Sequence, residues 1–215
     1  MPKGLVKFPG AAQFLPDHRT LRTLRRAVNE CRGCELYRYA TQAVLGEGPA
    51  RARLMLVGEQ PGNEEDTQGH PFVGPAGKLL DSTLSDAGID RDEVYVTNAV
   101  KHFKFEERGK RRLHKKPRMS EIKACQPWLE AEAALVRPEI IVCLGATAVQ
   151  SILGSRYKLT EQRGKFIEHP WAKLVTATIH PSAVLRTPEA AARHEEYRRL
   201  VADLSKVNEV LKRAG

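Results

Sequence analysis

Three polar side chains lie at the ends of apolar runs, and each has a chemistry that a bound ligand could use: Glu59, Asn98 and His180. A carboxylate can act as a base or stabilise a cation, and an imidazole can stabilise a developing negative charge. The amide of Asn98 offers a donor beside an acceptor, which suits the edge of a pyrimidine ring. Each residue also has a plainer interpretation, as a turn glutamate, a loop cap or an ordinary loop histidine.

Glu59 lies in a glycine- and proline-rich stretch at 58–62, and a second such stretch runs from 69 to 77. Two turns of this kind predict a shaped loop rather than a helix. Their glycine spacing fits neither a Walker loop, which needs Gly-Lys-Ser/Thr, nor a dinucleotide fingerprint, so nucleoside triphosphates and nicotinamide cofactors are weak candidates. Phe72, in the second stretch, can stack on a base, although phenylalanine is more often a core residue.

Positive charge is concentrated in one segment. The 215-residue chain has 35 Lys and Arg against 26 Asp and Glu, a formal net charge of +9, and residues 101–118 hold nine basic and two acidic residues. Because this segment lies between a predicted strand and a predicted helix, we expect an extended basic loop at 102–118. It is either a solvated surface loop or a contact for the phosphates of a nucleic acid.

Four cysteines are too few for a disulfide-stapled secreted fold of this length. Cys31 and Cys34 are spaced to bind one metal centre, and Cys125, at the start of a predicted helix, is a third candidate ligand. A thioredoxin-like redox pair is the alternative for Cys31 and Cys34, but that pair precedes the first strand instead of following one. Cys143 lies inside an apolar strand and needs no metal.

The order of predicted elements alternates between strand and helix. Continuous apolar runs, typical of strands covered on both faces, lie at 53–58, 94–100, 139–145 and 174–179. Helical patterns lie at 20–29, 76–87, 120–135 (with Ser120 as N-cap), 146–153 and 188–212. No repeat or linker divides the chain. We therefore expect a single domain over 1–215, a three-layer α/β/α fold with a four-stranded, mainly parallel sheet, whose ligand binds beyond the carboxyl ends of the strands.

Three stretches together resemble the motifs of the uracil-DNA glycosylase superfamily, in the same order: Gly-Glu-Gln-Pro-Gly at 58–62, Thr-Asn-Ala-Val-Lys at 97–101, and His-Pro-Ser at 180–182. The resemblance spans about 31–186 and is greatest for the iron–sulfur branch with the family-four enzymes. Within that branch, the basic segment 110–114 is similar to the signature loop of the X-type proteins, which bond covalently to the DNA that they deglycosylate. Asn63 departs from relatives that carry an acid there.

The resemblance implies excision of uracil from DNA after the nucleotide leaves the base stack, a DNA-repair activity. The catalytic residues that it implies are Glu59, Gln60, His114 and His180. The implied substrate-binding residues are Gly58, Gln60, Asp66, Phe72 and Asn98. Candidate DNA-phosphate contacts are Lys110, Arg111, Arg112, Lys115, Ser182 and Arg186.

The X-type resemblance gives His114 a particular role, as the side chain that bonds to C1′ of the deoxyribose and traps the protein after one turnover. Neighbouring cations should keep it neutral and nucleophilic, because like charge opposes protonation: Lys110, Arg111, Arg112, Lys115 and Lys116. Two alternatives stay open. One is a conventional turnover glycosylase whose basic loop only grips DNA, and the other is a non-catalytic, cluster-bearing DNA-binding module.

Family-four relatives carry a ligating cysteine directly after the middle motif, where this chain has His102. The resemblance therefore implies a 4Fe–4S cluster held by Cys31, Cys34, His102 and Cys125, with zinc on the same residues as the alternative. No apolar run approaches the ~18 residues that span a bilayer, and residues 1–10 lack a signal-peptide core. We expect a cytoplasmic monomer that binds single-stranded as well as double-stranded DNA.

Overall fold

The computed structural model describes residues 8–213 of the chain. At its centre is a five-stranded sheet in the order β2-β1-β5-β7-β6. Its strands are β1 (Leu54–Gly58), β2 (Val94–Asn98), β5 (Ile140–Leu144), β6 (Ile167–His169) and β7 (Ala172–Thr178). All neighbours are parallel except β6, which runs antiparallel to β7. The predicted α/β fold with a mainly parallel sheet is confirmed. The sheet has one strand more than expected, because the three residues of β6 are too short to form an apolar run.

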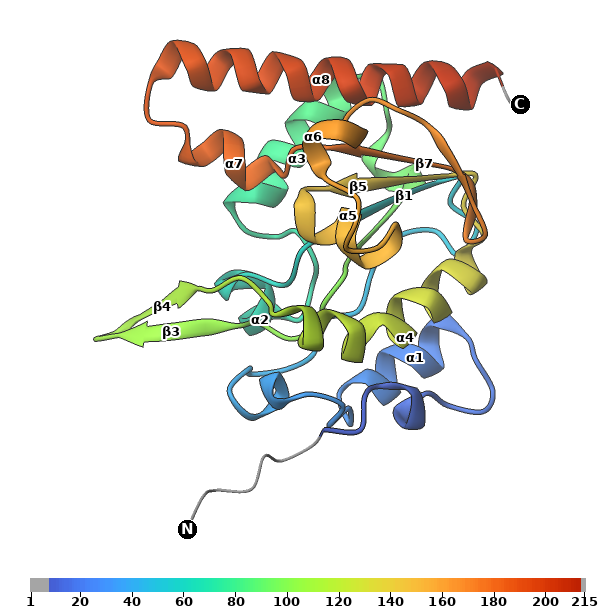
Figure 1. Cartoon of the computed structure of the whole chain (residues 1–215), viewed down its shortest axis with the longest axis vertical. Helices are drawn as coiled ribbons and strands as arrows, with labels where there is room; N and C mark the ends of the chain where they lie inside the picture. Colours follow the sequence, from blue (N-terminus) through green and yellow to red (C-terminus); the bar gives the residue numbers. More distant parts are fainter. Residues whose placement is uncertain (1–7, 214–215) are drawn as a thin grey trace.

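Helices cover both faces of this sheet because the strand residues alternate between two apolar clusters. Met55, Tyr95 and Ile141 pack with α4 (Met119–Val136) and α5 (Ala146–Ile152) on one face. Leu56 and Val142 pack with α3 (Pro75–Asp86) and α8 (Ala190–Arg213) on the other. Figure 1 shows α8 and α3 on one side of the sheet, and α4 with α1 on the opposite side. The strands are therefore buried on both faces, which explains their continuous apolar pattern.

Shorter helices complete the chain: α1 (Leu21–Val28), α2 (Asn63–Gln68), α6 (Leu159–Gln162) and α7 (Pro181–Arg186), with 3-10 turns at Ala12–Phe14, Glu35–Arg38 and Arg91–Glu93. Two expectations were wrong here. The loop expected between the two glycine-rich turns contains α2, whose start is fixed by a bond from the Gly62 N–H to Glu65 (3.0 Å). Ser120 does not cap α4, because the Arg118 N–H donates to Glu121 (2.6 Å) and the helix begins at Met119.

The basic segment is a β-hairpin rather than the extended loop that the charge pattern predicted. Strands β3 (Phe105–Arg108) and β4 (Arg111–His114) pair antiparallel, and Figure 1 shows them projecting from the body of the molecule. Gly109 occupies the first turn position with φ +58°, a conformation that suits a two-residue hairpin turn and favours glycine. Because side chains alternate along β4, Arg112 and His114 lie on the same face of the hairpin.

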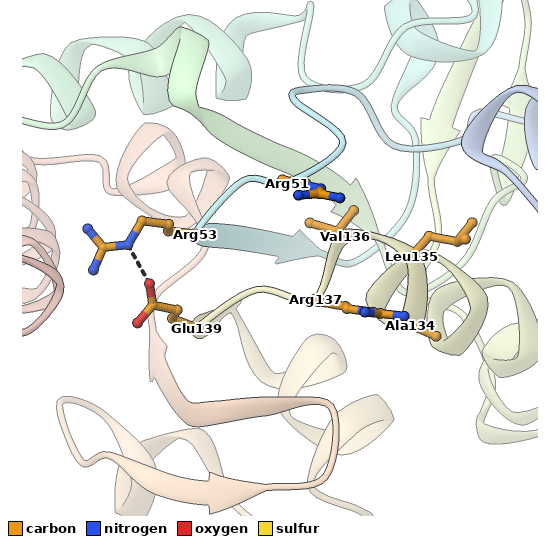
Figure 2. A pocket seen from close by; sticks show the side chains of 7 residues that line it. All are labelled: Arg51, Arg53, Ala134, Leu135, Val136, Arg137 and Glu139. Carbon is orange, nitrogen blue, oxygen red and sulfur yellow. Dashed lines mark hydrogen bonds and ion pairs between the residues drawn. The ribbon is translucent and has the colours of Figure 1, made fainter. Parts of the chain in front are cut away.

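A cleft of about 480 Å³ lies at the amino edge of the sheet, opposite the edge where the strands end. Figure 2 shows Arg53 paired with Glu139 among its lining residues. Arg53 also donates to the carbonyl of Leu211 (2.7 Å), so it ties β1 and β5 to the end of α8. Arg51 and Arg137 line the same cleft beside the last turn of α4, where positive charge suits the negative end of a helix dipole.

None of the helices described by the structure is long and apolar enough to cross a membrane. The expectation that residues 1–10 contain no signal-peptide core falls largely outside the described residues, which begin at residue 8.

Candidate active site

A cleft of about 880 Å³ lies at the carboxyl edge of the parallel sheet. It is lined by the loops after β1, β2, β5 and β7 and by the hairpin, with residues that include Glu59, Gln60, Asn63, Phe72, Asn98, His114, Lys116, Thr147, His180, Ser182 and Arg186. The fold therefore brings the three motifs together. Several candidate residues do not line the cleft: Asp66, Lys110, Arg111, Arg112 and Lys115.

The floor of the cleft is formed where three side chains converge on Gly58. A Cβ atom at Gly58 would clash with Asn98 Oδ1, would lie 2.7 Å from the tip of the Phe72 ring, and would come within 3.4 Å of His180 Nε2. Only glycine fits there. The Phe72 and His180 rings are stacked, with centroids 6.1 Å apart. The backbone carbonyl of Asn98 accepts a bond, but within residues 8–213 no hydrogen bond occupies its side-chain amide, which is free for a ligand.

Phe72 is held in an uncommon backbone conformation, with φ +58°. Its carbonyl lies against Gly77 at the start of α3, where any side chain would clash with it. A non-glycine residue in this region is strained and persists only where its surroundings fix it. The turn after α2 is thus built to present the Phe72 ring to the cleft.

His180 is arranged as a neutral hydrogen-bond donor. The Ser182 N–H donates to its Nδ1 (3.1 Å), so Nδ1 carries the lone pair and the ring proton sits on Nε2, which faces the cleft floor. Ser182 Oγ lies 2.8 Å from Nδ1 and accepts a bond from Arg186 (3.0 Å). Burial, aided by the charges of Arg186 and His114, lowers the pKa of His180 to about 4. Ser182 therefore orients His180, and its contact with a DNA phosphate stays a prediction.

Glu59 lines the same cleft as His180 and contacts two side chains. Thr147 donates its hydroxyl to Glu59 Oε2, and His114 Nε2 lies 3.3 Å from Glu59 Oε1. Thr147 is a buried residue that the sequence analysis missed. The signal was present, because Thr147 follows β5 as the other site residues follow their strands. Gly145, with φ +90°, starts α5 and places Thr147 there.

The pKa of His114 is lowered, as expected, but for a different reason. Burial against the cleft is the main cause, the charge of Arg186 adds to it, and the Glu59 carboxylate opposes it. The neighbouring cations named from the sequence are not the cause. Lys115 pairs with Glu106, and Arg112 is turned inwards, so their charges are taken up by other groups.

Gln60 lines the cleft, but its amide is engaged elsewhere. Its Nε2 donates to the carbonyls of Lys104 (3.0 Å) and Lys115 (3.2 Å), and its Oε1 accepts from the Lys104 N–H (3.3 Å). These bonds close the base of the hairpin. The Gln60 amide therefore holds the hairpin base, and the catalytic and substrate-binding roles that the resemblance implied stay predictions.

Asp66 and Arg112, which do not line the cleft, bind each other. Asp66 is fully buried, accepts one bifurcated bond from the Thr41 N–H, and binds Arg112 at 2.6 Å. Arg112 donates further to Asn63 (2.8 Å) and lies over the Phe105 ring at 5.1 Å. This pair anchors the hairpin to α2. The exposed basic groups near the cleft include Lys110 and Arg111 at the hairpin tip, Lys115, which pairs with Glu106, Lys116 in the cleft lining, and Arg186 on the rim.

Three of the candidate metal ligands share one apolar cluster between α1 and α4. Cys31 and Cys125 are buried in it, and Cys34 is half-buried at its edge. Trp128 donates to Cys31 Sγ, and the Lys101 N–H donates to Cys125 Sγ, both at 3.3 Å. The buried His102 is the next residue after Lys101, so it follows directly on the backbone group that binds Cys125. Cys143 lies elsewhere, inside the sheet.

Burial raises the pKa of the Cys34 thiol to about 11 and that of Cys125 to about 12, so a metal would have to displace their protons. Across residues 8–213, no three Cys, His, Asp or Glu side chains lie close enough to hold a single ion. The shared apolar cluster fits a metal centre that would be bound by Cys31, Cys34 and Cys125, and both a 4Fe–4S group and zinc stay predictions for it.

The chain belongs to the uracil DNA glycosylase superfamily, whose model matches residues 45–205. It is 38% identical over 190 residues to the type-4 uracil-DNA glycosylase of Thermotoga maritima, a match that covers 87% of this chain and 93% of that protein. The type-4 enzyme of Archaeoglobus fulgidus is 36% identical over 192 residues, with 86% and 90% covered. A type-5 uracil-DNA glycosylase of Thermus thermophilus is 31% identical over 131 residues, with 54% and 56% covered.

Proposed function

We propose that this protein is a uracil-DNA glycosylase that cleaves the bond between uracil and deoxyribose in DNA. The observation that carries the proposal is the convergence of Phe72, Asn98 and His180 on Gly58 at the cleft floor. This arrangement offers a stacking surface, an unoccupied amide and a ring N–H within one small volume. The similarity to type-4 uracil-DNA glycosylases over nearly the whole chain supports the same reaction.

In the proposed reaction, the flipped uracil stacks on Phe72 and pairs its N3–H and O4 edge with the Asn98 amide. As the bond between C1′ and N1 breaks, its electron pair leaves with the base, which becomes an anion. The Nε2–H of His180 donates to that developing charge, as donors do in an oxyanion hole. The neutral His180 suits this role, because Nδ1 is already bound by Ser182.

The deoxyribose cation left behind faces Glu59. A carboxylate on this side stabilises the cation and can take a proton from an attacking water, which yields an abasic strand. The bond from Thr147 and the contact with His114 hold the Glu59 carboxylate in this position.

We further propose that His114 captures this cation, as the similarity of residues 110–114 to the X-type loop implies. In the free protein Nε2 lies 3.3 Å from Glu59 Oε1, so the Nε2 proton passes to this carboxylate as Nε2 forms a bond to C1′ with the freed electron pair and uracil leaves as the anion. The ring in the adduct is then a neutral imidazole, because its Nδ1 carries no proton. A ring bonded in this way is a poor leaving group, so the adduct persists and turnover stops after one event.

The proposed cofactor is a 4Fe–4S cluster bound by Cys31, Cys34, His102 and Cys125. Its contribution is structural cross-linking of the chain, because the three thiols lie in the cluster of residues that joins α1 to α4. We also propose that the chain is a single-domain monomer that accepts single-stranded as well as double-stranded DNA, since Lys110 and Arg111 at the exposed hairpin tip can follow a flexible strand.

The test is to mix the protein with a single-stranded oligonucleotide that carries one uracil, and to analyse both free base and DNA after boiling in SDS. We expect released uracil and a boiling-resistant protein–DNA band, neither of which forms with the matching thymine strand. His114→Ser should lose the band and still release uracil, because water can reach the cation. Release without any band would support the turnover enzyme instead, and no release would refute the proposed function.

A further inference from the structure

A fully buried ion pair, Lys101 with Glu132, lies behind the cleft floor and takes no part in the proposed reaction. The Lys101 ammonium has three donors, and each has an acceptor: a Glu132 carboxylate oxygen, the Thr97 hydroxyl (2.7 Å) and the backbone carbonyl of Asn98 (2.7 Å). The last contact connects the ion pair to the residue whose free amide lies in the cleft.

Glu132 is fixed as firmly as its partner. It projects from α4 and accepts bonds from the Tyr95 hydroxyl (2.9 Å) and the Gly46 N–H (2.7 Å). A Cβ atom at Gly46 would lie 2.5 Å from the Tyr95 ring and 2.6 Å from Glu132 Oε1, so only glycine allows this approach. Glu132 is thus held by α4, β2 and the chain before β1 at once.

Stability does not explain such a pair. Removing two charges from water costs about as much as their attraction returns, and a well-packed apolar pair of similar size is often at least as stable. A buried ion pair can instead fix the position of the groups that it binds, because hydrogen bonds are directional. Here one of the hydrogen bonds from Lys101 goes to the backbone carbonyl of Asn98.

Lys101 also joins the cleft to the cysteines through its own backbone. Its N–H donates to Cys125 Sγ (3.3 Å) and its carbonyl accepts from the Val44 N–H (2.8 Å). The turn at 98–101 is therefore held from both sides, by the side chain of Lys101 at Asn98 and by its backbone at the cysteine cluster.

We propose that Lys101, with Glu132 as its counter-ion, is a positioning residue that holds Asn98 where its amide can read the edge of a pyrimidine. This inference rests on the proposed function, since it assigns Asn98 to uracil. It predicts that Lys101 acts only through Asn98 and contributes nothing once the Asn98 amide is removed.

The test is a double-mutant cycle between Asn98→Ala and the paired change Lys101→Met with Glu132→Gln. The paired change leaves no buried charge, and a glutamine can still accept from Gly46 and Tyr95. The readout is the ratio of dissociation constants for two single strands, one with a 2′-fluorinated deoxycytidine and one with a 2′-fluorinated deoxyuridine. Fluorine makes the glycosidic bond resist cleavage, and cytosine reverses the donor and acceptor that the Asn98 amide is proposed to read. Asn98→Ala should lower this uracil preference about 10-fold.

The paired change should cause a similar loss, and adding it to Asn98→Ala should cause no further loss. The inference would be overturned if the losses of uracil preference caused by Asn98→Ala and by the paired change multiplied in the combined variant. An unchanged preference in the paired variant would overturn it as well. Tyr95→Phe is the matched control, because it removes a buried bond to Glu132 without touching Lys101 or Asn98. It should lower the melting temperature and leave the uracil preference intact. Should the paired variant fail to fold, Thr97→Val, which removes one acceptor of Lys101, takes its place in the cycle.

A wild-type protein that binds both strands equally would refute the proposed function and not the positioning role. That role would then be decided by hydrogen exchange of the backbone amides at 98–101. Faster exchange in the paired variant than in Tyr95→Phe supports it, and equal exchange overturns it.

Discussion

A histidine that donates to a leaving base is useful only if its proton sits on the nitrogen that faces the base. In His180 the proton lies on Nε2, because the Ser182 N–H donates to Nδ1. The pKa of His180, lowered to about 4, keeps the ring neutral over the physiological range. We therefore expect no change in uracil release from the titration of His180 between pH 8 and 5.

The same shift predicts how stability depends on pH. An unfolded histidine titrates near 6.5, and folded His180 near 4, so between these values only the unfolded state gains the proton. Stability is fully present above pH 6.5 and falls on acidification, by at most about 1.4 kcal/mol per pH unit from this residue. Urea unfolding of wild type and His180→Asn at pH 7 and pH 5 measures this, because other groups titrate alike in both. An identical pH dependence would contradict it.

Thr147 gives a second prediction at the residue scale. Its hydroxyl is bound to Glu59, and valine has the same shape without the donor. We expect Thr147→Val to reduce single-turnover uracil release about 10-fold, less than Glu59→Gln, which removes the charge and should cost about 100-fold. Thr147→Ser keeps the donor and is the control. If valine and serine variants release uracil equally fast, Thr147 does not position Glu59.

At the scale of elements, the hairpin explains why some site residues could not be predicted from the sequence. The basic composition of 102–118 indicated a phosphate-binding loop, but composition cannot show that Arg112 turns inwards to Asp66 or that Gln60 binds the base of the hairpin. Both contacts join residues more than 40 positions apart. In contrast, Glu59, Asn98 and His180 follow strands, and the sheet itself brings them together.

The Arg112–Asp66 pair should decide where His114 lies, because both Arg112 and His114 belong to β4. Removing one partner of a buried pair leaves the other uncompensated, so Arg112→Met should destabilise the protein by on the order of 3 kcal/mol. It should also slow adduct formation more than uracil release. Arg111→Met, at the exposed tip, is the matched control and should only weaken DNA binding and its salt dependence. Equal effects of the two substitutions on adduct formation would show that Arg112 does not anchor the hairpin.

At the scale of the whole molecule, the amino and carboxyl edges of the sheet differ in structure. The amino end carries the Arg53–Glu139 ion pair (Figure 2), and the carboxyl end holds the candidate active-site cleft. The architecture was predictable because strands buried on both faces have continuous apolar sequences. The third apolar cluster, in which Cys31 and Cys125 meet, was visible only as cysteine spacing, because its packing depends on α1 and α4 meeting beside the sheet.

The last prediction concerns that cluster of cysteines. If Cys31, Cys34 and Cys125 hold a 4Fe–4S group, protein purified without oxygen should be brown and contain four irons and four sulfides per chain. Cys31→Ser should lose the colour and lower the melting temperature, because a group that binds only the folded state stabilises it. Cys143→Ser is the matched control: it is an equally buried cysteine, but it belongs to the sheet and should keep its iron. Loss of iron in Cys143→Ser with retention in His102→Ala would place the fourth ligand in the sheet and remove His102 from the set.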